Sequence, residues 1–199
     1  MNTKTRKLTA TALMVAITLI LGFTPLGFLR IPFTTIDITF MCLPIIIGTV
    51  VIGWKEGLLL GLVFALTSLF KALTAPSPLL VPLLQYPLAL YPSIFIPRLL
   101  IPLSVWGVYC LTKKLPRAVG LGITAAAGSL TNTVLFLGMV FYLGAKPIAQ
   151  SFGMTVEAVG AVLTAVVLTN GLPEAAAAVI LCTPIIMVLD KTFKKGISK

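Results

Sequence analysis

Long apolar segments, broken only by short polar or Pro-rich stretches, constrain the fold of this chain more than any other feature. Mean hydropathy is +1.10 and charged residues make up 10% of the sequence, whereas soluble domains carry roughly 25%. A run of about 20 apolar residues is long enough to cross a bilayer as a helix. The sequence therefore predicts an all-α integral membrane protein.

Six apolar segments predict six transmembrane helices within a single domain that covers residues 1–199. We expect these helices at about 8–23, 39–53, 57–73, 93–112, 118–143 and 158–189. Three longer connections separate them, at 24–38, 74–92 and 144–157. Five prolines fall within 74–92, so this segment is predicted to be a Pro-rich loop and not a regular helix.

The distribution of Lys and Arg predicts the orientation in the membrane. With six helices both termini lie on one side, which collects eleven of the 15 basic residues: Lys4, Arg6, Lys7, Lys55, Lys113, Lys114, Arg117, Lys191, Lys194, Lys195 and Lys199. The other side has four: Arg30, Lys71, Arg98 and Lys146. Cytoplasmic loops carry the excess of basic residues, so we expect both termini in the cytoplasm of a multi-pass plasma-membrane protein.

Several classes of function lack the residues that they need. The chain has no His and five acidic residues, which argues against a His-ligated metal and against a membrane-embedded enzyme. It has no Gly-rich phosphate loop, so we predict neither a cofactor nor an ATPase activity of its own. The net charge of +10 comes from cations at helix ends, which favours a role in topology over nucleic-acid binding.

Polar residues in the middle of apolar segments are the candidate site. Thr131 and Asn132 lie halfway along the segment 118–143, and Asn170 and Glu174 lie four residues apart in the last segment. Unpaired polar groups are costly at bilayer depth, so such residues contact either a ligand or a neighbouring helix. Pro173 cannot donate to the carbonyl of Thr169, which leaves an acceptor in the middle of this helix.

Three further features complete the candidate residues. Arg98, near the start of the segment 93–112, suits a carboxylate ligand, or else extends to the lipid headgroups. Tyr91, in the preceding loop, is a lid residue or a member of the interfacial aromatic belt. Ala12 and Ala16 form a small-xxx-small face that allows close approach of another helix.

The chain resembles the substrate-binding S component of energy-coupling factor (ECF) vitamin transporters. The motifs that carry the resemblance are Ala12-Leu-Met-Val-Ala16, Leu43-Pro44-Ile-Ile-Ile-Gly48, Gly53-Trp-Lys-Glu-Gly57, Gly61-Leu-Val-Phe-Ala-Leu-Thr-Ser68, Pro97-Arg98-Leu-Leu, Gly128-Ser-Leu-Thr-Asn-Thr133 and Asn170-Gly-Leu-Pro-Glu174. The last three are the most specific, and they are similar to the pantothenate-type branch.

The resemblance implies a mechanism and partners. It implies a vitamin bound near the outer surface, a membrane T component, and two ATPase subunits that drive uptake. Ala12 and Ala16 are implied to face the T component. Pantothenate, with its carboxylate, amide and hydroxyls, suits Arg98 and the two Asn side chains. The alternatives are a pyrimidine or pyridine vitamin precursor, for which Arg98 would be superfluous, and a stand-alone small-solute carrier.

Overall fold

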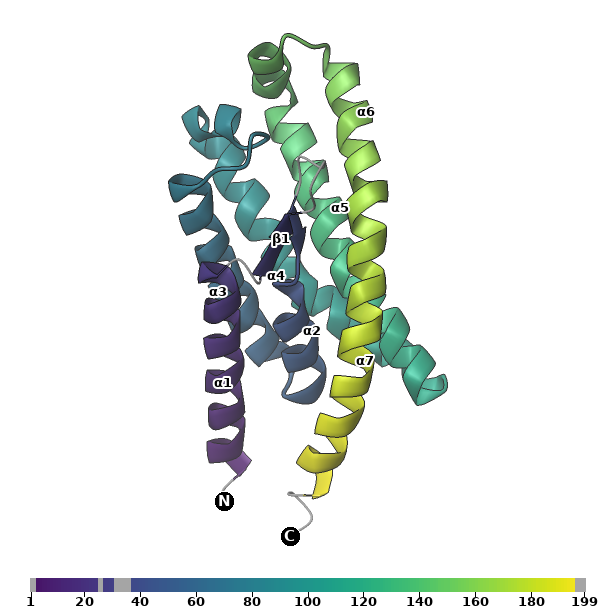
Figure 1. Cartoon of the computed structure of the whole chain (residues 1–199). Coiled ribbons are helices and arrows are strands. Elements are labelled where there is room, and N and C mark those ends of the chain that lie inside the picture. The colour runs from purple at the N-terminus through teal and green to yellow at the C-terminus, as the bar shows by residue number, and fades with distance from the viewer. Residues whose placement is uncertain (1–2, 25–26, 31–36, 196–199) are drawn as a thin grey trace.

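A computed structural model describes residues 3–24, 27–30 and 37–195 of the chain as a bundle of helices (Figure 1). The α-helices are α1 (Thr3–Phe23), α2 (Cys42–Val51), α3 (Trp54–Thr74), α4 (Pro87–Leu111), α5 (Arg117–Phe152), α6 (Val156–Val166) and α7 (Leu172–Lys195). The shorter elements are the strands β1 (Phe28–Arg30) and β2 (Asp37–Thr39), the 3-10 helices η2 (Val81–Gln85) and η3 (Thr112–Lys114), and the π-helical turn η4 (Val167–Gly171).

Five helical segments in the described part of the chain are long and apolar enough to cross a membrane, and α2 is a shorter apolar helix. The fifth segment is continuous through α6, η4 and α7. These findings confirm the all-α membrane fold. The helix predicted at 39–53 is wrong at its start, because α2 begins only at Cys42. With 10 residues, α2 is about 15 Å long.

A small antiparallel β-hairpin precedes α2. Phe28 pairs with Thr39 and Arg30 with Asp37. Part of the predicted loop 24–38, namely 25–26 and 31–36, lies outside the described residues. Thr39, the last residue of β2, donates its backbone N–H to the carboxylate of Glu174 on α7.

The predicted Pro-rich loop at 74–92 is too long, because α4 already begins at Pro87. Pro92, Pro97 and Pro102 all lie inside α4. A proline cannot donate to the carbonyl four residues earlier, but membrane helices tolerate it where another group satisfies that carbonyl. Pro97 frees the carbonyl of Ser93, which accepts a hydrogen bond from Arg98 Nη1 at 3.3 Å.

Gly61 accommodates a second interruption of α4. Pro102 cannot donate to the carbonyl of Arg98, and α3 passes so close to that carbonyl that a Cβ on Gly61 would lie 2.6 Å from the oxygen. Glycine is therefore required where α3 crosses α4.

The predicted loop at 144–157 is wrong, because α5 continues to Phe152 with Pro147 inside it. Gly144 packs against Leu83, and a Cβ there would lie 3.0 Å from that side chain. The actual connection is short: Gly153 ends α5 at φ +62°, and Thr155 Oγ1 accepts a hydrogen bond from the backbone N–H of Ala158 at 3.2 Å.

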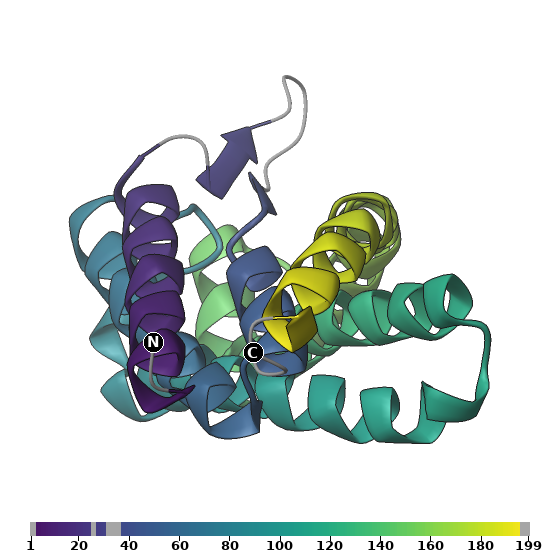
Figure 2. The ribbon, with the colours of Figure 1, turned by 90° about the horizontal axis from the view of Figure 1, so that it is seen from below.

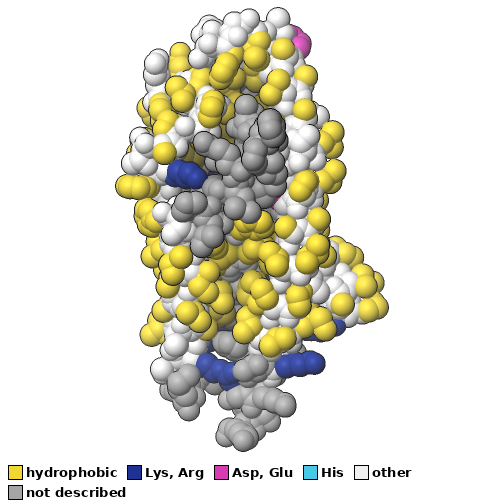
Figure 3. All heavy atoms as spheres, viewed as in Figure 1, with side chains coloured by type: hydrophobic (Ala, Val, Ile, Leu, Met, Phe, Trp, Pro, Cys, Tyr) yellow, Lys and Arg dark blue, Asp and Glu magenta, His cyan; other side chains and the backbone are white. Residues whose placement is uncertain are grey.

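Two hydrophobic clusters occupy opposite ends of the bundle. The first includes Ile45, Ile46, Phe64, Ile101, Val105 and Ile186. The second includes Leu83, Leu90, Ile94, Leu137, Ile148 and Leu163. Figure 2 shows the bundle from the end that carries both termini, and Figure 3 shows apolar side chains over most of the visible face, with most of the visible Lys and Arg side chains near that same end. The polar site lies between the two clusters.

Candidate functional site

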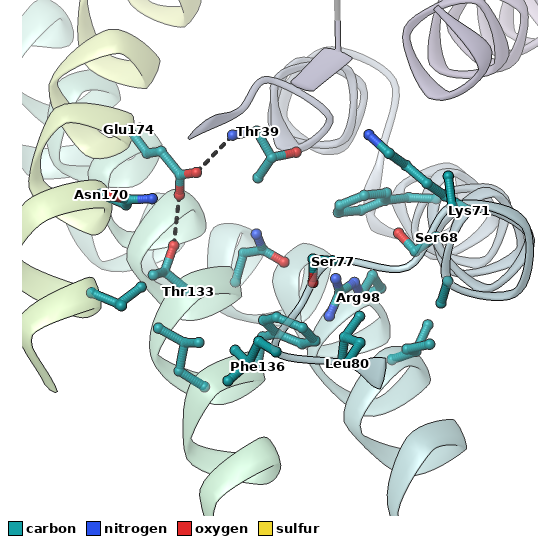
Figure 4. Close-up of a pocket in the computed structure, with 18 residues that line it drawn as sticks. Thr39, Ser68, Lys71, Ser77, Leu80, Arg98, Thr133, Phe136, Asn170 and Glu174 are labelled. Atoms are coloured by element: carbon teal, nitrogen blue, oxygen red, sulfur yellow. Dashed lines mark hydrogen bonds between the residues drawn. The ribbon is translucent and has the colours of Figure 1, made fainter. Parts of the chain in front are cut away.

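A cavity of about 150 Å³ lies between α3, α4, α5 and the last long helix, with Thr39 at its edge (Figure 4). Four residues predicted from the sequence, Arg98, Asn132, Asn170 and Glu174, line it together. They come from three helices far apart in the chain. The structure thus brings the polar positions of three apolar segments to one cavity.

The backbone of the last helix widens where it meets the cavity. The π-helical turn η4 covers Val167–Gly171, just before Pro173. Such turns insert an extra residue into a helix and occur frequently at functional sites. Gly171 lies close to α5, since a Cβ there would be 3.3 Å from Thr133 Cγ2. The turn and the close approach set Asn170 against the cavity.

Glu174 is buried and bound on both oxygens. Its Oε1 accepts a hydrogen bond from the backbone N–H of Thr39, and its Oε2 accepts one from Thr133 Oγ1, each at 2.7 Å. The residue is 5% exposed. One carboxylate therefore joins α7 to α5 and to the end of the β-hairpin, and it is fixed in place at the cavity wall.

Arg98 is held between two aromatic rings. Its guanidinium carbon lies 4.4 Å from the ring centre of Phe136 and 5.2 Å from that of Phe64. Cation–π contacts of this kind stabilise a desolvated cation. Among the described residues no carboxylate pairs with Arg98, and its Nη1 bonds the carbonyl of Ser93. A buried guanidinium without a counter-ion attracts an anion.

Four buried polar atoms of the cavity lining have no hydrogen-bond partner among the described residues. They are Ser68 Oγ, Arg98 Nε, Asn132 Oδ1 and Asn170 Nδ2. Leaving a buried donor or acceptor unsatisfied costs about 1–3 kcal/mol, and native proteins keep few such atoms. Two donors, an acceptor and a hydroxyl thus face the same space, which suits a polar ligand.

Two predicted site residues lie elsewhere. Thr131 Oγ1 is 2.7 Å from Ser104 Oγ on α4 and also donates to the carbonyl of Ala127, so it joins two helices. Tyr91 is 46% exposed on α4 and does not line the cavity. Neither is placed to contact a molecule inside the cavity.

Several lining residues escaped sequence reasoning. Phe64, Ser68 and Lys71 follow one another at spacings of four and three on α3, which is the signal of a shared helix face. Thr133, not Thr131, is the threonine that faces the site. The others in this group are Thr39, Ser77 and Phe136.

Ala12 and Ala16 lie exposed on α1, which packs against α3 and α2. Their predicted role in a partner interface stays a prediction. Elsewhere, the described residues contain no group of three His, Cys, Asp or Glu side chains that would hold a metal ion.

Comparison with known proteins identifies relatives of the chain. Residues 6–186 match the family model described as ECF transporter, substrate-specific component. The chain is also 34% identical over 160 residues to the pantothenic acid transporter PanT of Lactococcus lactis subsp. cremoris (strain MG1363), an alignment that covers 77% of this chain and 78% of the relative.

Proposed function

The chain belongs to the ECF transporter family of substrate-specific components, and from this premise we propose that it binds pantothenate for uptake across the plasma membrane. As a member of that family it is a membrane-embedded subunit of a vitamin transporter. Pantothenate as the cargo is supported by the similarity to PanT and by the chemistry of the cavity.

The observation that carries this proposal is the set of unpartnered polar atoms in the cavity. Pantothenate is a monoanion with one amide and two hydroxyls. The guanidinium of Arg98 suits its carboxylate, because charge-assisted hydrogen bonds to arginine are among the strongest in proteins. The amides of Asn132 and Asn170 suit its hydroxyls and its own amide. A neutral pyrimidine would leave the buried charge of Arg98 uncompensated.

A panel of radiolabelled B vitamins tests the proposal on purified chain in detergent or nanodiscs. We expect saturable binding of pantothenate, with unlabelled pantothenate as the only effective competitor. Tight binding of a neutral pyrimidine or pyridine vitamin, with no binding of pantothenate, would contradict the assignment of the cargo.

Energy for uptake must come from partner subunits, since the sequence contains no nucleotide-binding loop. The partners of this family are a membrane T component and two ATPases, and we propose the exposed face of α1 at Ala12 and Ala16 as the contact with the T component. The same proposal places both termini in the cytoplasm, in keeping with the eleven-to-four distribution of basic residues.

A further inference from the structure

Resting on the proposed function, we propose that Glu174 is a specificity-determining residue that fixes the direction in which the vitamin binds. At the α7 end of the cavity, its carboxylate accepts hydrogen bonds from hydroxyl groups of the ligand. The same carboxylate repels a second anionic group of the ligand. The vitamin then lies with its hydroxyls toward α7 and its carboxylate toward α4, and a derivative phosphorylated on a hydroxyl is rejected.

The first step is that Glu174 is fixed but not saturated. Thr39 N–H and Thr133 Oγ1 each bind one of its oxygens at 2.7 Å. An ionised carboxylate has about four acceptor directions and no donor. The remaining directions therefore accept a ligand hydroxyl, whereas a carboxylate or phosphate of the ligand offers only further acceptors.

Asn170 adds a hydrogen-bond donor beside the carboxylate of Glu174. Its Oδ1 accepts a hydrogen bond from Thr169 Oγ1 at 3.2 Å, and its Nδ2 is buried without a partner among the described residues. With this bond made, the end of the amide that stays unpaired is the donor Nδ2. A hydroxyl that donates to Glu174 can accept from Asn170 Nδ2, so the pair recognises both sides of one hydroxyl group.

The opposite wall of the cavity is positive. Figure 4 shows Arg98, Ser68 and Lys71 on the other side of the cavity from Glu174 and Asn170. Arg98 Nε and Ser68 Oγ are buried without partners among the described residues. An anionic group is therefore favoured at this wall and disfavoured at the wall formed by α7.

The charges of the described lining also limit where the ligand can carry negative charge. Arg98 is buried with no carboxylate partner among the described residues, and Glu174 is the acid of the opposite wall. One anionic group of the ligand is therefore matched at Arg98. A phosphate ester adds up to two further negative charges beside Glu174, and placing like charges together lowers affinity by ~100-fold or more.

Three ligands and two variants test the orientation by equilibrium binding to the purified full chain. The ligands are pantothenate, pantothenol, in which a CH2OH group replaces the carboxylate, and pantothenate phosphorylated on its terminal hydroxyl. The variants are Arg98→Gln and Glu174→Gln. Glu157→Gln, an exposed acid at the start of α6, is the matched control for Glu174→Gln.

Wild type is expected to prefer pantothenate over pantothenol by ~10-fold or more, because one charge-assisted bond is lost. Arg98→Gln should abolish that preference. Glu174→Gln should retain it and should bring the phosphorylated ligand at least tenfold closer to pantothenate in affinity. Glu157→Gln should change neither ratio.

The ratios separate specificity from simple structural damage, which would lower all three affinities together. Equal losses for all ligands in both variants would overturn the orientation, and so would a Glu174→Gln variant that loses the preference for the carboxylate. If a variant does not fold, wild type alone decides: equal affinity for pantothenate and its phosphorylated form refutes the role of Glu174. Failure of wild type to bind pantothenate would instead refute the proposed function.

Discussion

Neighbouring residues of one helix in this protein have different roles: some pack helices together, and others line the cavity. Thr131, Asn132 and Thr133 are consecutive on α5, yet they do three different things. Thr131 bonds Ser104 on α4, Thr133 holds Glu174, and Asn132 is buried at the cavity with its Oδ1 unpartnered among the described residues. A turn of 100° per residue sends three neighbours to three surroundings.

This contrast predicts opposite effects for two neighbouring substitutions. Asn132→Ala should weaken pantothenate binding ~10-fold or more, because a buried ligand group loses its partner. Thr131→Val should leave the affinity within about threefold and lower the thermal stability instead, since it removes a helix–helix hydrogen bond worth ~0.6–2 kcal/mol. Isothermal titration and a thermal melt of both variants provide the measurements. Equal affinities for the two variants would remove Asn132 from the site.

The sequence identifies the polar residues of the site better than their directions. Asn132, Asn170 and Glu174 stand out because polar groups at bilayer depth need a reason. Whether Thr131 or Thr133 faces the cavity depends on the rotation of α5 about its axis. That rotation is set by packing against the neighbouring helices. Lys71 is not singled out by the sequence, because a lysine at a helix end can also extend to the lipid headgroups.

Gly128 shows the same limit. A glycine one turn before Asn132 can leave room for a ligand or for a neighbouring helix, and here a Cβ would lie 2.6 Å from Val105 and 2.9 Å from Ile46. The space is filled by α4 and α2, so the glycine serves close packing of helices.

Helices of this bundle contain internal prolines, which helices of soluble proteins rarely do, and α4 is the clearest case. Pro92, one of its three internal prolines, falls in the predicted loop 74–92, so the helix is expected to start near residue 93 instead of Pro87. Inside the bundle the carbonyls that prolines leave free are met by Arg98 and approached by α3. Sequence rules for prolines take no account of such tertiary partners, so the Pro-rich segment predicts a start of α4 that is too late.

Pro97 thereby acts as a positioning residue for Arg98. Pro97→Ala restores a backbone donor to the carbonyl of Ser93, which then competes with Arg98 Nη1. We expect pantothenate affinity to fall about three- to tenfold while the thermal stability stays equal or rises. Pro92→Ala, elsewhere on the same helix, is the control and should leave affinity unchanged. An unchanged affinity in Pro97→Ala would show that the hydrogen bond to Ser93 does not position Arg98.

The helix α1 offers a second test at this scale. Ala16→Leu adds bulk to an exposed face that does not touch the cavity. We therefore expect normal pantothenate binding by the purified variant and loss of uptake in cells that contain the full transporter, because close helix approach needs small residues. Leu13→Ala, which reduces bulk at an exposed position nearby, should retain uptake. Unchanged uptake in Ala16→Leu would exclude this face from the partner interface.

At the scale of the whole molecule, the described ends of α1 and α7 lie at the same end of the bundle (Figure 1). The arrangement agrees with an even number of crossings, and the charge distribution predicts that this end lies in the cytoplasm. Two of the three connections predicted from the sequence, 74–92 and 144–157, are shorter in the structure. Even so, the alternation of basic and apolar ends survives, because it depends on where cations cluster and not on where each helix stops.

Cysteine accessibility tests this orientation. In a background without the three native cysteines, Gln150→Cys, at the far end of α5, should react with a membrane-impermeant thiol reagent in intact cells. Lys191→Cys, near the end of α7, should react only after the membrane is permeabilised. Labelling of position 191 but not 150 in intact cells would invert the topology.

The position of the cavity between two hydrophobic clusters has a consequence for the life of the protein. Phe64 of the first cluster and Ile94, Leu137 and Val166 of the second meet at its walls. A bound vitamin therefore completes the interior, much as a cofactor does. A ligand present at 100 times its dissociation constant raises the free energy of unfolding by about 2.7 kcal/mol. Vitamin supply would thus govern turnover: starved cells hold a protein that opens more often to membrane proteases, and fed cells hold one that persists.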